Sequence, residues 1–547
     1  MTARFLLSAF ALWTFSTGAS VATTLQQEVP QQVASSLEEA VSSSGDASGQ
    51  AFRTDDSERP QGVRMSGAGS TSIGLADALN AAVQKSPDVA VAAEFKSMER
   101  ASLRTAASAF EPHLYGSLGS GQSATPLSSL QRPSPDVRTA AQSYQRYEFG
   151  VHRRFRSGIE VTPTVQMTRT VAGEAAVLNE TSAGLSLRYP VVGGRVRSTD
   201  RAAEDAAAQR VEAAGMDEVQ AKQSAMTGAA LAYWDYVGAA LVLNTLSEAE
   251  AQSIRLLDEM EILVAADERP AADLITVQAD LARRRASRLQ AEQAAFEAQQ
   301  ALALAMGDAD ADDIGPPSDG LPAVRPLTLL DERALVALAL ERRTDLHAAD
   351  RRYRAAVRMV RARRADLRPA LDLVVDAAYS ALSEGAAETY QYLPLGIGAT
   401  RGNRVGVSLQ INRLGSGAAR AASRRAAAER DRLRILHDDA ARRIRAEVAF
   451  AVVRLRSSAA EVSQTRAAVA LYEEAVENER RRLRLSMGTL FDVQMMEERL
   501  INARVETVRS EVRYARALGQ LRAATGTLLA EDPVVTAARL HSIPNTP

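Results

Sequence analysis

The sequence contains no cysteine, few aromatic residues and no marked excess of either charge. The absence of cysteine excludes disulfides, thiol nucleophiles and cysteine-ligated metals, and we also expect no lipid anchor. Lysine and arginine total 65 against 67 aspartate and glutamate, so the formal net charge of -2 gives no general reason to expect a nucleic-acid partner. Only 5% of the 547 residues are aromatic although 46% are apolar, a composition that favours long helices over compact cores.

Side chains with catalytic or metal-binding potential are scattered along the chain. None of the five histidines has the spacing of a metal-ligand motif; they are His113, His152, His347, His437 and His541. The glycines of segment 396–402 are spaced wrongly for a dinucleotide-binding loop, which predicts a surface loop there. Arginine runs such as 480–482 have acidic neighbours and indicate solvated helix faces. The sequence therefore predicts no enzyme, no cofactor, no metal site and no nucleic-acid partner.

The N-terminal segment has the pattern of a secretory signal peptide. Arg4 precedes the apolar stretch 5–15, and residues 20–22 have the small-x-small form of a cleavage site. We therefore expect residues 1–22 to be a signal peptide that directs export. Residues 23–70 are rich in glutamine, serine and glycine, which predicts a disordered segment. Beyond them we find no run of about 18 apolar residues and expect no transmembrane helix.

The chain repeats its motifs in a fixed order. Asp88 in one motif recurs as Asp345, and Pro112 recurs as Pro369, in both cases 257 residues later. Further motif pairs follow in the same order at offsets of 222 and 219 residues. We interpret the chain as two structural repeats, residues 71–310 and 327–528, each with the order helix, strands, long helix, turn, helix. A Pro-rich linker, residues 311–326, separates them, and residues 529–547 form a C-terminal tail.

Several short segments have the two-residue period of β-strands. Residues 371–380 and 404–412 alternate between apolar and polar side chains, which predicts strands with one apolar face. Residues 185–189, and more weakly 114–118, form the matching strands of the first half. Residues 145–168 add a candidate hairpin. We therefore expect four to six strands per chain.

The number of strands bears on what the sheet does. Alternation alone is also compatible with an ordinary β-sandwich. Four to six strands are too few to close even the smallest membrane barrel of about 8, and an open edge in lipid leaves backbone groups without partners, so other copies of the chain must complete the barrel. The polar side chains that would line its lumen are Asp372, Asp376, Arg404 and Gln410. The two aspartates would favour cations, unless they are simply hydrated wall.

Apolar residues at strict seven-residue spacing follow the second pair of strands. They are Val448, Leu455, Val462, Val469, Val476 and Leu483. This spacing predicts a left-handed supercoil with a partner helix, and a helix from about 418 to 485 would be roughly 100 Å long. A solvated dimeric coiled coil would explain the heptads alone. The attached strands favour a wall of neighbouring helices instead.

Over about residues 72–528, the chain resembles the TolC-like outer-membrane efflux protein family. Segment 75–80 with 86–88 is similar to that family's helix entry, and 190–195 is similar to its strand-to-helix junction. Segment 484–493 matches its glycine turn followed by an aspartate at a helix N-terminus. The order of the motifs and their duplication carry the resemblance.

The resemblance implies a mainly α-helical homotrimer, in which a 12-stranded transmembrane β-barrel continues as a periplasmic coiled-coil barrel of twelve helices. It also implies that the helical tips contact a periplasmic adaptor protein fed by an inner-membrane transporter. The tip residues so identified are Gly488, Thr489, Leu490 and Asp492 in the second tip, with Pro270 and Asp273 in the first.

Two features depart from the family pattern. Arg269 stands in the first tip where Gly488 stands in the second, and the hairpin 145–168 would raise the strand count to 18 if it joined the barrel. Apart from any adaptor contact, we expect Gly488 to supply a positive φ in the turn. We expect Asp492 to cap the helix that follows.

These observations predict the outer-membrane channel subunit of a tripartite efflux or type I secretion system, a passive exit duct in the outer membrane of a Gram-negative-type bacterium. A soluble periplasmic coiled-coil scaffold is the alternative, and recovery in the soluble periplasm would favour it. An envelope hydrolase is disfavoured because the sequence offers no site for one.

Overall fold

A computed structural model describes residues 72–130, 134, 136, 138–172, 176–192, 199–308, 314–325, 331–385, 400–412, 417–485, 487–528 and 533–541. The chain divides into two units, Met1–Gln61 and Gly62–Pro547, and all the described residues belong to the second. The expected signal peptide, the expected disordered segment, the junction residues 193–195 and part of the linker lie outside the described residues.

The helices of the two halves match in length, element for element. Helices α1 (Leu75–Lys85) and α5 (Glu332–Arg342) have 11 residues each, and α2 (Pro87–Ser108) and α6 (Thr344–Ala365) have 22 each. The long helices α3 (Thr199–Ala265) and α7 (Gly417–Arg484) have 67 and 68 residues, and α4 (Ala271–Met306) and α8 (Leu490–Ala524) have 36 and 35. The halves therefore differ mainly in their strands.

Six strands form one antiparallel sheet in chain order. The first half contributes four of them, β1 (His113–Pro126), β2 (Thr139–Arg154), β3 (Glu160–Ala172) and β4 (Ala176–Val192). The second half contributes β5 (Ala370–Glu384) and β6 (Thr400–Asn412). Residues 400–402, which we expected to belong to a surface loop, are the first residues of β6. The candidate hairpin is β2 and β3, and it lies inside the sheet between β1 and β4.

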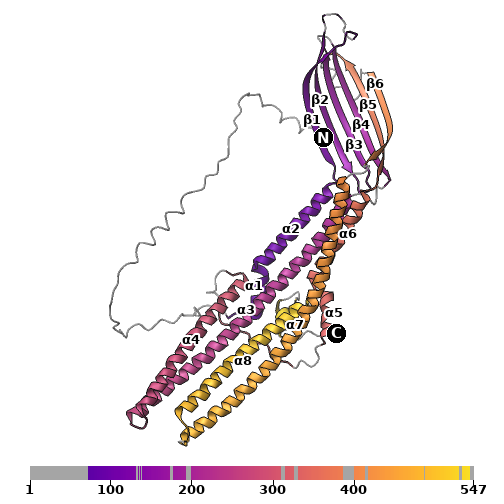
Figure 1. Cartoon of the computed structure of the whole chain (residues 1–547). Coiled ribbons are helices and arrows are strands. Elements are labelled where there is room, and N and C mark those ends of the chain that lie inside the picture. The colour runs from indigo at the N-terminus through magenta and orange to yellow at the C-terminus, as the bar shows by residue number, and fades with distance from the viewer. Residues whose placement is uncertain are drawn as a thin grey trace, which may run out of the picture. The chain divides into compact units, whose positions relative to one another are not determined.

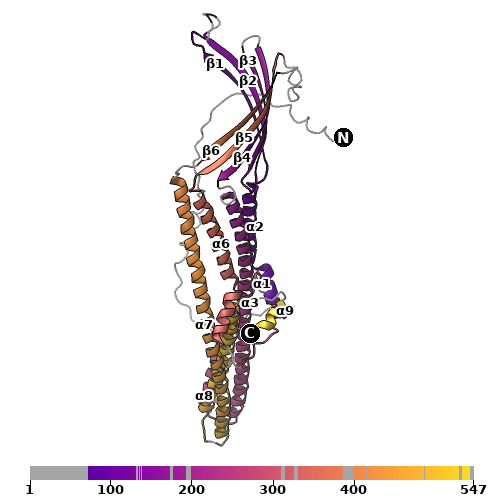
Figure 2. The same cartoon turned by 90° about the vertical axis from the view of Figure 1, so that its right-hand side faces the viewer.

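The helices pack side by side in layers (Figures 1 and 2). Near the sheet the order of contact is α2, α3, α6, α7, and further from it α4, α3, α8, α7. The heptad positions of α7 are confirmed as its packing seam, because Val448, Leu455 and Val462 are almost completely buried. They pack against α8 and α5 in one apolar core, and a second core surrounds the buried aromatic residues Tyr233 and Trp234 of α3.

Helix α3 contains one stretch that corrects our expectation about apolar runs. An 18-residue window of α3 is apolar enough, by length and composition, to cross a membrane. In the structure 44% of that window is buried, and α3 packs against α1, α2, α4, α6 and α8. The buried part of this window thus contributes to helix packing.

Part of the expected C-terminal tail forms a helix. Residues Pro533–Leu540 form helix α9, which packs against α1. Leu540 and Leu528 belong to the same buried core as Trp234. The segment after α8 thus stabilises the middle of the helical part.

Candidate functional site

One face of the sheet carries a band of apolar and uncharged residues across all six strands, and the charged residues Arg153, Arg169 and Arg401 lie on this face outside that band. The register aligns Gly116, Phe149, Val165, Ala183, Tyr379 and Asn403 in one uncharged row. Two residues further along each strand the same face carries Leu114, Val151, Pro163, Leu185, Ala377 and Val405. Most of the large apolar side chains in these two rows are exposed, and along β6 the exposed fraction is 75% for Val405 and 69% for Val407. No described residue covers them.

The opposite face is polar and internally hydrogen-bonded. Its charges alternate from strand to strand near the helical end of the sheet. Arg154 of β2 donates to Glu160 of β3 at 2.8 Å, and Arg188 of β4 lies 3.7 Å from that carboxylate. Arg188 also donates to Asp372 of β5 at 3.2 Å. This pattern suits a wall in contact with water.

All four expected lumen residues, Asp372, Asp376, Arg404 and Gln410, lie on the polar face. Asp376 accepts a hydrogen bond from Ser186 at 2.7 Å, and Arg188 also donates to Gln410 at 3.4 Å. Because Asp372 pairs with Arg188, the polar face carries alternating charge here and not a concentrated negative patch. Among the described residues Asp372 forms an ion pair and Asp376 does not. Asp376 would therefore contribute most of any preference of the lumen for cations.

The second helical tip, between α7 and α8, contains the expected cap. Thr489 is the N-cap of α8, and its Oγ1 accepts from the backbone N–H of Asp492 at 3.2 Å. In return the Asp492 carboxylate accepts from the Thr489 backbone N–H at 3.1 Å. The Asp492 carboxylate also accepts from the Thr489 hydroxyl at 2.7 Å, and this bond, together with the one from the Thr489 backbone N–H, holds the pKa of Asp492 below its usual value. The capping role of Asp492 is confirmed.

The expectation of a positive φ at Gly488 is wrong. Positive φ occurs among the described glycines at Gly158, Gly307, Gly385 and Gly526. Gly488 instead occupies a crowded position. A Cβ added there would lie 3.3 Å from the Cβ of Arg482 and 3.5 Å from the Leu483 nitrogen. The tip turn folds back closely on the end of α7, where the Met487 N–H donates to the Arg482 carbonyl at 2.9 Å.

The first tip, between α3 and α4, uses a different device. Asp267 adopts a positive φ of 59°, which aspartate tolerates better than most residues. Pro270 is the N-cap residue of α4, and Asp273 lies in its first turn, 3.9 Å from Arg269. Sequence analysis missed Asp267, although an aspartate at the end of a long helical pattern was the available signal.

Two ion pairs, one buried and one exposed, join the two helical hairpins above the tips. Arg284 of α4 is 6% exposed, donates to Asp280 at 2.7 Å and lies 3.5 Å from Glu497 of α8. Its neighbour Arg283 pairs with Glu498, also on α8. Sequence analysis missed this cluster because nothing in the sequence indicates that α4 and α8 approach each other.

The outer helices of the packed layer each carry an exposed, uncharged stripe. On α7 the stripe consists of Ala446, Phe450, Val453, Ser457, Ala460, Gln464, Ala467 and Leu471. On α4 it consists of Ile275, Ala279, Ala282, Ala286, Leu289, Gln293, Phe296, Gln300 and Leu304. Both follow the three- and four-residue spacing of one helix face. Since both helices are otherwise rich in charge, these stripes are candidate contact surfaces.

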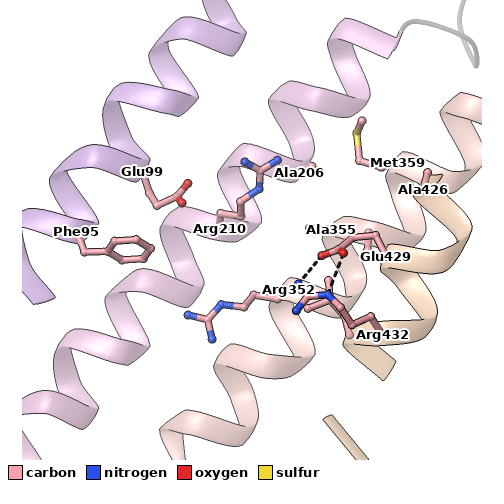
Figure 3. A pocket seen from close by; sticks show the side chains of 12 residues that line it. Phe95, Glu99, Ala206, Arg210, Arg352, Ala355, Met359, Ala426, Glu429 and Arg432 are labelled. Carbon is pink, nitrogen blue, oxygen red and sulfur yellow. Dashed lines mark hydrogen bonds and ion pairs between the residues drawn. The ribbon is translucent and has the colours of Figure 1, made fainter. Parts of the chain in front are cut away.

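A cavity of about 290 Å³ lies between α2, α3, α6 and α7, and Figure 3 shows the side chains that line it. Phe95, Ala206 and Met359 are among its apolar lining residues. On its polar side Arg432 donates to Glu429 at 2.7 Å, whereas one carboxylate oxygen of Glu99 is buried without a hydrogen bond. The lining holds no nucleophile paired with a base.

The described residues contain no group of three or more histidine, aspartate or glutamate side chains placed to hold a metal ion. His113 and His152 lie in β1 and β2, where His152 Nδ1 is 3.0 Å from the Thr162 hydroxyl. His347 is 2.6 Å from the Glu341 carbonyl oxygen, and His437 is 3.2 Å from Asp438. His152, His347 and His437 thus each have a separate local partner.

Comparison with known proteins gives a fold and no sequence relative. No protein-family model matches the chain, and no curated protein matches its sequence. The structure is similar to the outer membrane protein VceC from Vibrio cholerae, with a TM-score of 0.60 and 19% identity over 83% of this chain and 96% of that one. It is also similar to the CmeC outer membrane channel of Campylobacter jejuni, with a TM-score of 0.60 and 16% identity over 85% and 89% of the two chains.

A third similar structure is the open state of the Neisseria gonorrhoeae MtrE outer membrane channel, with a TM-score of 0.58 and 16% identity over 83% of this chain and 88% of that one. These matches span most of the chain and confirm the fold expected from the resemblance, long helices joined to an antiparallel sheet.

Proposed function

We propose that this chain, which has the fold of outer-membrane channels, is the subunit of a passive exit duct in the outer membrane of a Gram-negative-type bacterium. In this proposal the chain is exported by its signal peptide, is not lipidated and forms a homotrimer. A periplasmic adaptor and an inner-membrane transporter deliver the substrate, as in tripartite efflux or type I secretion.

The observation that carries the proposal is the exposed apolar face of the sheet. Eight exposed apolar side chains of β4 to β6 lie on it, namely Leu185, Tyr189, Val192, Tyr379, Val405, Val407, Leu409 and Ile411. A face of this kind is unfavourable in water, and in lipid it is the expected outer surface of a barrel strand. The polar face, with its alternating charges, then lines water.

The free edges of the sheet and of the helical layer support closure by identical copies. Strand β1 follows α2 directly and β6 precedes α7, so each sheet edge continues into an edge of the helical layer. Within the described residues β1 and β6 have neighbours on one side only. An unpaired edge is not tolerated in lipid, and β1 and β6 of successive copies run antiparallel, as barrel closure requires.

The tips are the proposed adaptor contacts. The second tip offers Gly488, Thr489 and Leu490 beside the capping Asp492, and Met487 and Phe491 are exposed there as well. The first tip offers Pro270 and Asp273 at the start of α4. Exposed apolar side chains next to fixed helix starts suit a protein partner.

Site-directed spin labelling in reconstituted bilayers tests the proposal. Because the chain has no cysteine, single labels at Leu373 and Val407 report only those positions. We expect both to be accessible to oxygen, which partitions into lipid, and protected from a water-soluble relaxing agent. A label at Ser408, on the polar face, is the matched control and is expected to show the reverse.

Fractionation addresses the alternative of a soluble scaffold. The channel is expected in the outer-membrane fraction and, after mild detergent extraction, as a trimer by light scattering. Quantitative recovery in the soluble periplasm, or aqueous surroundings at both Leu373 and Val407, would overturn the channel proposal and support a scaffold.

A further inference from the structure

The hairpin of β2 and β3 is built into the sheet along its whole length. On one side β2 pairs with β1 from His113–His152 to Pro126–Thr139 without a register shift. On the other side β3 pairs with β4 from Glu160–Arg188 to Ala172–Ala176, again without a shift. A hairpin folded over the rim or into the lumen would leave β1 to pair with β4, and here they are separated by two strands.

The two faces of the hairpin agree with those of the other strands. Phe149 and Val165 pair with each other and lie in the same row as Ala183 and Tyr379 on the apolar face. On the polar face Glu148 pairs with Gln166, which pairs with Ser182. Strands that match on both faces are equally suited to lipid on one side and water on the other.

We infer that the membrane barrel of the homotrimer has 18 strands, six from each copy, and not the 12 that the family resemblance implies. The inference rests on the proposed channel function, and it assigns the barrel a lumen for bulky hydrated cargo. The membrane part is then no narrower than the helical part.

Geometry gives the widths. With strands about 4.8 Å apart and tilted by about 40°, a barrel of 18 strands has a backbone diameter of about 36 Å, against about 24 Å for 12 strands. Three copies with four helices at each level give twelve helices, and a ring of twelve helices about 9 Å apart is about 34 Å across its axes. Barrel and helical ring therefore have nearly the same width.

Side chains narrow the lumen, but an aqueous channel remains. Allowing about 5 Å of side chain on each wall leaves a lumen of about 26 Å, as expected for the 16–18-stranded barrels that hold open water channels, against about 14 Å for 12 strands. Size selection would then fall to the helical part, and the barrel would admit hydrated cargo too wide for a 12-stranded barrel.

Cysteine pairs in the full-length protein test the strand order, and the cysteine-free sequence provides a clean background. Ser120 lies opposite Gln145 in β1 and β2, and Gln166 lies opposite Ser182 in β3 and β4. In purified trimers we expect Ser120→Cys/Gln145→Cys and Gln166→Cys/Ser182→Cys each to form an intramolecular disulfide on oxidation, seen as a shift of the monomer band on a denaturing gel.

The matched control pairs join β1 to β4. Ser120→Cys is combined in turn with Thr181→Cys, Ala183→Cys and Leu185→Cys, which lie on the same face of the sheet as Ser120 and sample the registers of a direct β1–β4 pairing. These pairs are expected to stay reduced, because three strand spacings, about 14 Å, exceed the reach of a disulfide. If a β1–β4 pair cross-links in assembled trimers and the β1–β2 pair does not, the hairpin lies outside the barrel and the inference is wrong, while the channel proposal stands.

Polymer exclusion tests the width directly. In planar bilayers, polyethylene glycol with a hydrodynamic radius of about 10 Å is added only on the side of the barrel, so that the helical part does not affect its entry. It fits a lumen of about 26 Å and is excluded from one of about 14 Å, so we expect a loss of single-channel conductance. An unchanged conductance, with smaller polymers still lowering it, would overturn the wide lumen.

Discussion

Thr489 and Asp492 bind each other's backbone N–H groups at the start of α8, at 3.2 and 3.1 Å. Removing one half of such a box leaves helix N–H groups without a partner. For Thr489→Ala we expect amide hydrogen exchange in the first turn of α8 to become about fivefold faster, the usual effect of losing a cap. The overall fold is unchanged, because the seam of α7 and α8 lies further along the helices.

A matched variant distinguishes the loss of the helix cap from the effect of replacing any threonine of α8. Thr507, in the middle of α8, donates to the Ala503 carbonyl at 2.9 Å and caps nothing. Thr507→Ala is therefore expected to leave exchange at the tip as it is. Equal acceleration by both variants would contradict the role given to Thr489.

Gly488→Trp is expected to abolish export and leave trimer assembly intact. The added side chain must find room where Arg482 Cβ and the Leu483 nitrogen already lie within 3.5 Å of an added Cβ. The tip turn is therefore displaced. The sheet, and the helix ends next to it, lie far from the substituted residue. Export of a known cargo and light scattering of the purified protein measure the two effects, and normal export would remove the tip from the adaptor contact.

What the sequence predicted well was repeated along an element or set by a few neighbouring residues. The seven-residue series from Val448 predicted the buried seam of α7, because one partner helix follows it over most of its length. The cap at Asp492 was predictable because its partner is three residues away. Alternation likewise predicted the two faces of β5 and β6.

Features that depend on distant segments were not predictable. The pairing of Arg283 with Glu498 joins residues 215 positions apart, and no local pattern points to it. The backbone conformation at Gly488 was wrongly predicted. The turn there requires a close approach to the end of α7 and not a positive φ. The membership of β2 and β3 in the sheet also needed the register, since a hairpin has the same alternation wherever it packs.

Glu218 links α2 and α3 and predicts a pH-dependent stability. Hydrogen bonds from Lys222 at 2.8 Å and Lys96 at 2.7 Å lower the pKa of Glu218 to about 2 from its usual 4.5. A lowered carboxylate pKa means that the stabilisation is present above about 4.5 and is lost as the pH falls toward 2.

We therefore expect Glu218→Gln to cost about 1 kcal/mol at pH 7, a modest value because solvent reaches both lysines. The difference from the native chain shrinks as the pH is lowered toward 2. Denaturant unfolding followed through the helical signal measures it, with Glu94→Gln, at an exposed position on α2, as the control. A difference that stays constant from pH 7 to pH 2.5 would show that the charge of Glu218 is not what stabilises the helix pair.

The uncharged stripes of α4 and α7 predict where successive copies meet. Leu289 and Phe450 are 48% and 74% exposed in the single chain, and each stands on an outer helix of the packed layer. A carboxylate placed in a closed interface would be desolvated without a partner, whereas in the single chain it stays in water. Leu289→Asp and Phe450→Asp are thus expected to give correctly folded chains that no longer form trimers, as measured by light scattering in detergent.

Two further substitutions place the same charge on the same helices but away from the stripes. Ala294 of α4 and Ala470 of α7 are both exposed, and Ala294→Asp and Ala470→Asp are expected to assemble normally. If all four variants assembled, the stripes would face solvent or lipid, and copies would meet elsewhere. If only the stripe variants failed to assemble, α4 of one copy would pair with α7 of the next. This pairing follows because the two helices are the two edges of one continuous layer, and a ring of copies brings these edges together.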